Sequence, residues 1–458
     1  MRPSFLGALA IPAFLSVASP VFGAGPPAES LALPTEEVLL PNGLHVLLAP
    51  DPNARLVSVQ VRYAVGSADD PNGRRGLAHL VEHVIASKTM HVDRALSVLE
   101  GAGATEFNAT TRPDETFYFE TLPPERLETA LWVESDRMGF SAVDETVVRE
   151  EREVIRNEDR DRRVDGMLAE VGVAMNHELY PSWHPYSSYA EGAADLDRIV
   201  LDDVRAFVRT WYSPTNATLA IAGRFDRDKA LALVDRYFSS LPRRLPPARP
   251  ELPPADERSV MLAVRAPTGA DEVFVAWRTP AFGAQDDTAL DLAARVLSGA
   301  GNDYFERALV AKHLATRAWA WEQSYRRESV FRVEAVAAPG VNPGYLADRI
   351  QDMLDAFARD VTAVQVDRAR REMRRSMVRQ LETTDGRVDQ LSALLDLGIP
   401  LGPRCEWERA RYERLHPDDV KRAVARWLTL GRRVVTVVLN NSSSPRRGAA
   451  VLREEVAQ

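Results

Sequence analysis

His79-Leu80-Val81-Glu82-His83 is the stretch of this sequence that says most about its fold and chemistry. The pattern around it is helical from Gly76 onward. Two histidines four positions apart on a helix lie on one face, about one turn from each other. Zinc binds neutral imidazole nitrogens and carboxylate oxygens in proteins. We therefore expect His79 and His83 to bind a metal ion, with Glu82 beside them.

These residues form H-x-x-E-H, the inverted zincin motif, in which the glutamate acts as a base and does not bind the metal. Histidines at this spacing also occur on solvated helix faces, but the full pattern is expected by chance only about 0.01 times in such a chain. A catalytic zinc ion uses three protein ligands and keeps a fourth position for water. The two histidines are therefore one ligand short.

The segment Arg149-Glu-Glu-Arg-Glu-Val-Ile-Arg-Asn-Glu158 offers the missing ligand. Glu151 and Glu158 are seven positions apart, which is close to two helical turns, so they share a face. Val154 and Ile155 lie between them and are expected to anchor the helix to the core. Glu158 would bind the metal, and Glu151 would hold a histidine ring or the water in place. Spacing alone does not separate Glu158 from its many acidic neighbours.

The composition is that of a globular protein with more than one domain. The chain has 458 residues, of which 45% are hydrophobic and 27% charged, and single cores rarely grow past about 250–300 residues. Its net charge of −9 argues against a nucleic-acid-binding protein. Cys405 is the only cysteine, which excludes an internal disulfide and a cysteine-rich zinc site.

The N-terminus has the layout of a secretory signal peptide. Arg2 precedes an uncharged apolar run from Phe5 to Val17, and small residues follow it. Cleavage after Gly23 or after Ala18 fits this pattern, and we assign residues 1–23 to the signal. A membrane anchor is the alternative, but the run is short for a bilayer of about 30 Å. The sequence predicts a secreted protein, in the periplasm of a bacterium, with no stable membrane insertion.

A proline-rich linker, residues 242–255, divides the mature chain. It follows an N-terminal domain over residues 33–241 and precedes a C-terminal domain over residues 256–441, with a tail over residues 442–458. The second half resembles the first: Val57-Ser-Val-Gln-Val-Arg and Val273-Phe-Val-Ala-Trp-Arg are each followed by a turn and a helix. We expect a duplicated α+β unit.

Several further motifs, in order, resemble the pitrilysin/insulinase family (M16) of zinc peptidases, in its two-domain, processing-peptidase-like branch (M16B). They are Leu40-Pro-Asn-Gly-Leu-His-Val, Gly66-Ser-Ala-Asp-Asp, Gly76-Leu-Ala-His-Leu-Val-Glu-His, Glu106-Phe-Asn-Ala-Thr-Thr, Thr116-Phe-Tyr-Phe, Glu151-x-Glu-Val-Ile-x-x-Glu158 and Tyr212-Ser-Pro-Thr-Asn-Ala-Thr-Leu-Ala-Ile-Ala-Gly. The resemblance implies an α+β fold of two duplicated α/β-sandwich domains. Each has a mixed or antiparallel sheet with helices packed on one face, and the second domain is inactive.

The resemblance also implies roles for individual residues. One Zn2+ per chain would be held by His79, His83 and Glu158, with Glu82 as general base and Glu151 in a supporting catalytic role. The segment from Phe107 to Thr110 would be an edge strand that binds extended peptides by strand addition. Asn108, Ala109 and Thr110 would contact the substrate. For Asn108 a plain turn residue is the alternative.

The second half departs from the family pattern. Active members of this branch often carry an Arg and a Tyr there, which bind substrate and the oxyanion, whereas alignment by eye places Asp303 and Thr316 at these positions. Either Arg307, Arg317 or Tyr325 substitutes, or a second subunit supplies the pair. Four other histidines, His91, His177, His184 and His313, are expected to be structural or surface residues.

The sequence therefore predicts a secreted zinc metalloendopeptidase that cleaves extended peptides. We expect it to be the catalytic subunit of a heterodimer with a related chain, a homodimer being the alternative. A non-catalytic scaffold or binding subunit of the same fold is the second hypothesis. A metal store or sensor is a third, with little support, because no other ligand residues cluster near the motif in the sequence.

Overall fold

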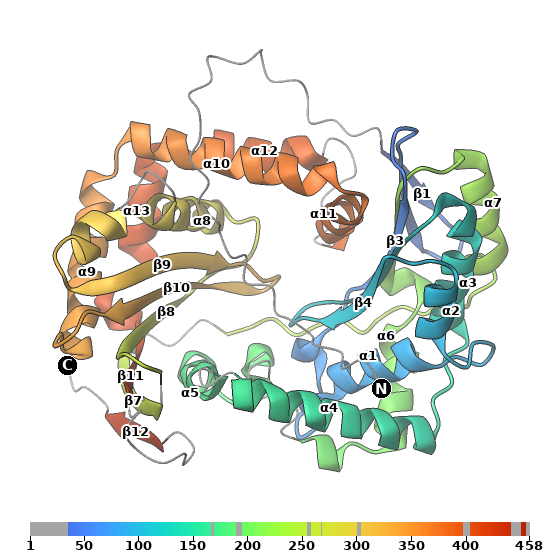
Figure 1. The fold of residues 1–458 in the computed structure, drawn as a ribbon, viewed down its shortest axis with the longest axis horizontal. Helices are drawn as coiled ribbons and strands as arrows, with labels where there is room; N and C mark the ends of the chain where they lie inside the picture. The colour runs from blue at the N-terminus through green and yellow to red at the C-terminus, as the bar shows by residue number, and fades with distance from the viewer. Residues whose placement is uncertain are drawn as a thin grey trace.

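The computed structural model contains two six-stranded sheets, one in each half of the chain (Figure 1). It describes residues 35–165, 169–188, 195–253, 258–266, 268–299, 304–396, 404–440 and 450–454. The predicted signal peptide and Asp303 lie outside these residues. Within them, no helix is both long enough and apolar enough to cross a membrane.

The first sheet has the strand order β1-β2-β6-β3-β5-β4. Only β2 and β6 run parallel, and the other neighbours are antiparallel. A turn at Asn42-Gly43 joins β1 and β2, with Gly43 at φ 92°, a conformation that glycine adopts without strain. The strands are β1 (Glu36–Leu39), β2 (His45–Pro50), β3 (Val57–Tyr63), β4 (Glu106–Thr111), β5 (Thr116–Leu122) and β6 (Ala217–Gly223).

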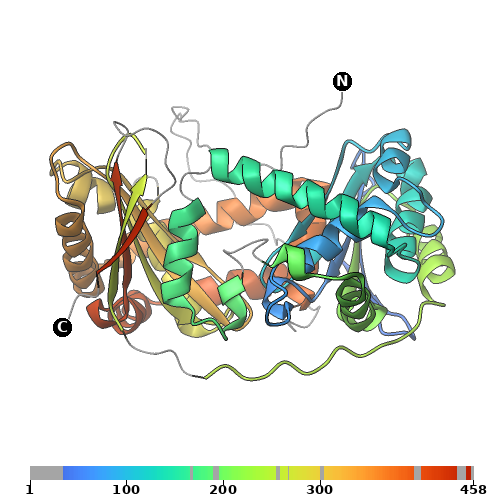
Figure 2. The ribbon, with the colours of Figure 1, turned by 90° about the horizontal axis from the view of Figure 1, so that it is seen from below.

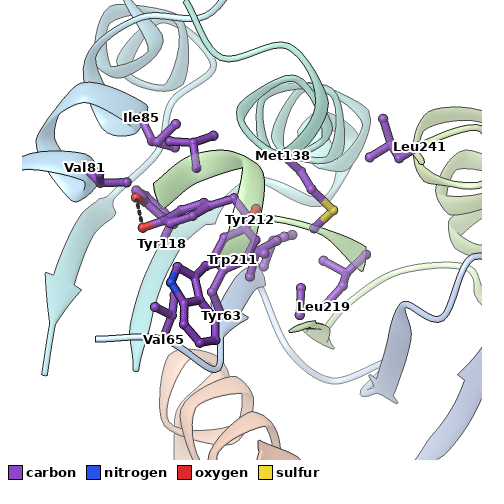
Figure 3. Packing of buried hydrophobic residues seen from close by; sticks show 14 of the residues in the cluster. Tyr63, Val65, Val81, Ile85, Tyr118, Met138, Trp211, Tyr212, Leu219 and Leu241 are labelled. Carbon is purple, nitrogen blue, oxygen red and sulfur yellow. Dashed lines mark hydrogen bonds between the residues drawn. The ribbon is translucent and has the colours of Figure 1, made fainter. Parts of the chain in front are cut away.

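One face of this sheet packs against helices of the same half. A single hydrophobic core joins the strands to α1, α3, α4, α6 and α7. Figure 3 shows part of this core, where Val81 and Ile85 of α1 lie against Tyr118 of β5. The helices of this half are α1 (Leu77–Ser87), α2 (Ala95–Gly101), α3 (Leu127–Gly139), α4 (Glu145–Asp165), α5 (Ala169–Leu179), α6 (Leu201–Trp211) and α7 (Arg227–Phe238).

The second sheet repeats the arrangement, with the order β12-β7-β11-β8-β10-β9. Again one pair, β7 and β11, is parallel and the others are antiparallel. Its strands are β7 (Val260–Ala266), β8 (Glu272–Pro280), β9 (Ala315–Gln323), β10 (Glu328–Ala337), β11 (Val434–Asn440) and β12 (Ala450–Glu454). Its helices are α8 (Gln285–Ser298), α9 (Pro343–Asp360), α10 (Ala363–Glu382), α11 (Thr384–Asp396), α12 (Arg404–Glu413) and α13 (Pro417–Trp427). The predicted fold of two α/β domains with mixed sheets is confirmed.

The structure adds a helix to the other face of each sheet, and each of these helices comes from the opposite half. Helix α11 places Val388 and Leu391 on β2 and β6 of the first sheet. Helix α5 places Met175 and Leu179 on β8, β10 and β11 of the second sheet. This exchange ties the two halves together through buried apolar contacts.

Two of the predicted segments make contacts that the sequence does not show. The proline-rich linker is extended, as Figure 2 shows, and Arg249 fixes it to the first half through Asp69 at 2.7 and 2.9 Å and through the ring of Trp211. The predicted tail contains a strand, β12, which pairs antiparallel with β7. Ala450–Glu454 is therefore an edge strand, and pairing with β7 satisfies the backbone groups on one of its sides.

Candidate active site

Helix α1 presents both histidines of the motif on one side and an apolar face on the other. Leu80, Val81 and Val84 are fully buried in the core of the first half. The helix begins at Gly76, whose φ of 91° is left-handed. The Asp70 carboxylate accepts hydrogen bonds of 2.8 Å from the backbone N–H groups of Gly76 and Ala78, which otherwise lack helical partners. Asp70 thus fixes the start of the helix one turn before His79.

The two imidazoles lie close together, half-buried. Their Nε2 atoms are 3.2 Å apart. Nε2 of His79 is 3.6 Å from Oε2 of Glu158, and Nε2 of His83 is 3.6 Å from Oε1 of the same carboxylate. Two ligands of a tetrahedral zinc ion, each about 2.0–2.1 Å from the metal, lie about 3.4 Å from each other. The histidine pair therefore has the spacing of two zinc ligands, and the Glu158 carboxylate lies beside both rings with the donor chemistry of a third ligand.

Helix α4 brings Glu151 and Glu158 to the histidines from about 70 positions further along the chain. Ile155, on the same side, is 1% exposed and anchors α4 in the core. The expectation that Val154 also anchors it is wrong: Val154 is 41% exposed, because it lies about 100° further round the helix. The Oε2 atom of Glu151 is 3.4 Å from Nδ1 of His83, so it contacts the nitrogen that faces away from the metal position.

The carboxylates make this a site for a cation. Burial lowers the pKa of the His83 imidazole, but its contacts with Glu151 and Glu158 and the charge of Glu82 outweigh burial and raise the pKa to about 10. The pocket thus stabilises a positive charge at this position, and a metal ion would replace the proton. His79, Glu82 and His83 each have a ligand atom within 4.8 Å of the other two, and no other group of three His, Cys, Asp or Glu side chains is that compact among the residues that the structure describes.

Glu82 is buried between the histidines and strand β4. Burial raises the pKa of Glu82 above its usual value, and the charge of Glu158 adds to this, while His83 and hydrogen bonds from Thr111 lower it. Thr111 is the last residue of β4 and bonds the carboxylate through both its backbone and its side chain. The carboxylate therefore sits at the end of the strand that the sequence predicts to bind substrate.

Strand β4 is the edge of the first sheet, as predicted. Its pairing with β5 continues into the turn, where the Arg112 N–H donates to the Glu115 carbonyl at 2.8 Å. Because pairing alternates along an antiparallel edge, Asn108 and Thr110 direct their backbone groups to β5, and Ala109 directs its own outward. The exposed Asn108 side chain accepts a hydrogen bond from the Ala109 N–H at 2.9 Å. Asn108 thus lies in a strand and not in a turn.

The second half contributes no Arg/Tyr pair at the aligned positions. Thr316 is exposed on β9, with its hydroxyl 3.4 Å from the Val336 carbonyl. Arg307 lies over the ring of Tyr304, and Arg317 over the ring of Trp319 at 4.6 Å. Tyr325, in the turn between β9 and β10, packs on Tyr186 with ring centroids 5.1 Å apart.

The other histidines lie outside the cluster. His91 pairs with Asp136 at 2.6 Å, and the buried His184 pairs with Glu328 at 3.0 Å. His177 and His313 are exposed.

Three contacts at the site are absent from the sequence analysis. Two of them are the contacts of Asp70 and Thr111 described above. In the third, the Tyr118 hydroxyl donates to the backbone carbonyl of Glu82 at 3.4 Å. The same hydroxyl bonds the Tyr212 hydroxyl at 3.3 Å (Figure 3). The acidic pair in Gly66-Ser-Ala-Asp-Asp, just before a helix, is the one sequence signal that points to such a cap.

Comparison with known families places this geometry in context. The model described as "Insulinase (Peptidase family M16)" matches residues 45–177, and the model described as "Peptidase M16 inactive domain" matches residues 198–373. The chain belongs to peptidase family M16. This M16 family member is 26% identical to the zinc protease PqqE of Helicobacter pylori over 379 residues, covering 81% of this chain and 85% of that protein.

A second sequence relative and a solved structure are also similar to this chain. A probable mitochondrial-processing peptidase subunit beta of Schizosaccharomyces pombe is 25% identical over 404 residues, covering 81% of this chain and 85% of that protein. The crystal structure of a protease from Helicobacter pylori superposes with a TM-score of 0.81 at 23% identity, covering 89% of this chain and 100% of that one. At that identity the superposition supports the shared fold alone.

Proposed function

We propose that the chain is a secreted zinc metallopeptidase that hydrolyses peptide bonds in extended peptides. The observation that carries this proposal is the group of ligand atoms from His79, His83 and Glu158 beside the buried carboxylate of Glu82. The two Nε2 atoms are 3.2 Å apart, and each is 3.6 Å from a different carboxylate oxygen of Glu158. The names of relatives, which include zinc proteases, support it. A periplasmic location is proposed from the N-terminal apolar run.

A zinc ion held by these residues would lower the pKa of a water toward about 7 and polarise the scissile carbonyl. Glu82 accepts the proton of that water at its carboxylate and passes it to the leaving amine. Burial raises the pKa of Glu82, which makes it a stronger base than an exposed glutamate. The hydrogen bonds from Thr111 hold the carboxylate in place during both transfers.

The other site residues orient the reactants. Glu151 holds the His83 ring through Nδ1 and so keeps Nε2 directed at the metal. The outward backbone groups of Ala109 pair with the backbone of an extended peptide, and Asn108 releases the Ala109 N–H for this contact. Thr110 supports the strand from the side of β5. This arrangement favours unfolded peptides over folded proteins.

We further propose that a related chain completes the site as a dimer partner. Thr316 has no phenol, and it stands where active relatives of this branch often carry a tyrosine. The name of one relative, a processing-peptidase subunit, supports this proposal. The same observation favours the second candidate, a non-catalytic subunit of the same fold.

One experiment separates the two candidates. The mature chain is purified, its zinc content is measured, and cleavage of an unstructured peptide is assayed with and without a co-purifying relative. We expect one zinc per chain and cleavage in at least one condition. Full zinc with no cleavage in either condition contradicts the enzyme and supports the scaffold. The Glu82→Gln variant should retain zinc and lose activity, and retention of activity would refute the assignment of the base.

A further inference from the structure

The second sheet has an inner face, defined here as the face on which α5 packs. Along β10, Phe331 and Val333 point into the core formed with the helices of the second half. Val330 points the other way and packs with Met175 of α5. Because side chains alternate along a strand, Arg332 and Glu334 share the inner face with Val330.

The inner face continues onto β9, beyond the reach of α5. Residues directly opposite in paired strands share a face, and the register sets Trp321 against Arg332 and Trp319 against Glu334. Arg317 follows next along β9, opposite Val336. Helix α5 packs chiefly on β7, β8 and β11, on the same face but away from β9. Both tryptophans are half-buried and Arg317 is exposed. We call Arg317, Trp319, Trp321 and Arg332 the inner wall.

The inner wall faces the side of the molecule that holds the metal helix. Helix α4 carries Glu158, and the next helix along the chain, α5, packs on the inner face of the second sheet. Tyr325, at the tip of the β9–β10 hairpin, belongs to a cluster that includes Ala68, just before the metal helix. The next residue, Arg326, donates its backbone N–H to Asp114 at 2.8 Å, in the turn that follows β4 (Figure 1).

The inner wall is positively charged, in a chain whose net charge is −9. The Arg317 guanidinium lies 4.6 Å from the centre of the Trp319 ring. The Nε of Arg332 is buried and has no hydrogen-bond partner in the part of the chain that the structure describes. Burial raises the pKa of both neighbouring carboxyl groups, that of Glu334 to about 7 and that of Glu272 above its usual value. Because its pKa lies near 7, Glu334 neutralises the arginines only in part near neutral pH.

We propose that the inner wall binds acidic side chains of a peptide held on strand β4, so that the substrates are unstructured peptides with Asp or Glu several residues from the cleaved bond. This rests on the proposed peptidase function. Guanidinium groups bind carboxylates through paired, charge-assisted hydrogen bonds, and the tryptophan faces offer apolar contact to the peptide between them.

The distances allow one peptide to reach both places. Thr111 and Asp114 are three residues apart, at most about 11 Å. Arg326 and Arg332 are six residues apart along a strand, about 20 Å. An extended peptide of about a dozen residues spans this path.

The test compares three fluorogenic peptides that differ only in a cluster of three residues, either Glu, Gln or Lys. Each is about 16 residues long, enough to reach the wall. The wall variant is Arg317→Gln with Arg332→Gln. Its control removes the same charge on the opposite side of the sheet, by Arg265→Gln in β7 and Arg295→Gln in α8, both of which are exposed. Matching thermal melting curves establish that all the proteins are folded.

In the unmodified protein we expect kcat/KM to fall in the order Glu, Gln, Lys. In the wall variant, kcat/KM should fall about tenfold for the Glu peptide and less than about twofold for the Gln peptide. In the unmodified protein, salt near 0.5 M should remove the preference for the Glu peptide over the Gln peptide. The control variant should keep the preference. Equal losses on the Glu and Gln peptides, or no loss on either, would overturn the proposal.

If none of the peptides is cleaved, binding decides separately. Labelled Glu and Gln peptides are titrated into the unmodified protein and the wall variant, and Kd is measured by fluorescence anisotropy. If the Kd for the Glu peptide is about tenfold lower in the unmodified protein than in the wall variant, the inner wall binds acidic peptides although the peptidase function is not supported. Equal Kd values for the two peptides overturn the wall independently of catalysis.

Discussion

The two halves of this protein have the same sheet, but among the residues that the structure describes only the first half has a cluster with the chemistry of a metal site. In each half a central strand, β3 or β8, leads into a helix on the same face, α1 or α8. Helix α1 carries two histidines and a glutamate, whereas α8, Gln-Asp-Asp-Thr-Ala-Leu-Asp-Leu-Ala-Ala-Arg-Val-Leu-Ser, has no histidine and buries most of its length. The backbone plan therefore does not make the site; side chains at three or four positions do.

Removing a proposed metal ligand should have the largest effect and should separate the two helices most clearly. His83→Ala leaves two ligands, and we expect activity to fall by at least about 10³-fold with loss of bound zinc. Arg295→Ala, at an exposed position of α8, should change neither. Zinc content by mass spectrometry and peptide cleavage test both. Full zinc in His83→Ala would remove this residue from the ligand set.

The helix that supports the histidines should matter next. Glu151→Gln weakens the hold on Nδ1 of His83, and we expect zinc affinity to fall about 10–100-fold. The neighbouring Glu150 is exposed, so Glu150→Gln is the matched control. Competition with a chelating dye measures both affinities. An equal fall in the two variants would mean that the charge of α4, and not the contact, holds the metal.

The exchanged helices make the first sheet depend on the second half for stability. Val388 of α11 is 1% exposed against strands of the first sheet. Val388→Ala should destabilise the protein by about 2 kcal/mol, through lost burial and a small cavity. Hydrogen exchange should then become faster in β2 and β6. Val378→Ala in α10, at a position 37% exposed, should leave exchange unchanged. Undisturbed exchange in β2 and β6 after Val388→Ala would show that α11 is dispensable there.

A carboxyl group of the second half should give a smaller, pH-dependent effect. Burial raises the pKa of Glu334 to about 7, so the folded state binds more protons than the unfolded state between about pH 4 and 7. This contribution to stability is present at pH 4 and is lost as the pH rises through 7. The free energy of unfolding of Glu334→Gln, relative to the unmodified protein, should therefore be about 1–2 kcal/mol more favourable to the folded state at pH 8 than at pH 4, as measured by urea unfolding. An equal effect at both pH values would contradict this assignment.

Most of the strands and helices could be predicted from local pattern. β5 (Thr116–Leu122) is a run of Thr, Phe, Tyr and Leu residues broken only by Glu120, a composition typical of a strand, and β4 is the expected edge. No element is predicted over α5, α11 or β9. Their apolar residues are few or interrupted, and their buried faces are defined by partners from distant parts of the chain, as with Val388 on β2. The contact of Arg62 with Asp389, over 327 positions, has no local signal either.

The sequence by itself determined the family, the duplicated α+β plan and the metal-binding motif, because each depends on spacing within a helix, a strand or a short segment. It also identified Glu151 and Glu158 as a pair on one face, since a helix fixes their relation to each other. Only the tertiary structure decided that this face meets His79 and His83 and that Thr111 holds Glu82. It also decided that α5 and α11 each pack on the sheet of the opposite half. Those relations join positions far apart in the chain, and they depend on how buried surfaces fit together, which no local periodicity specifies.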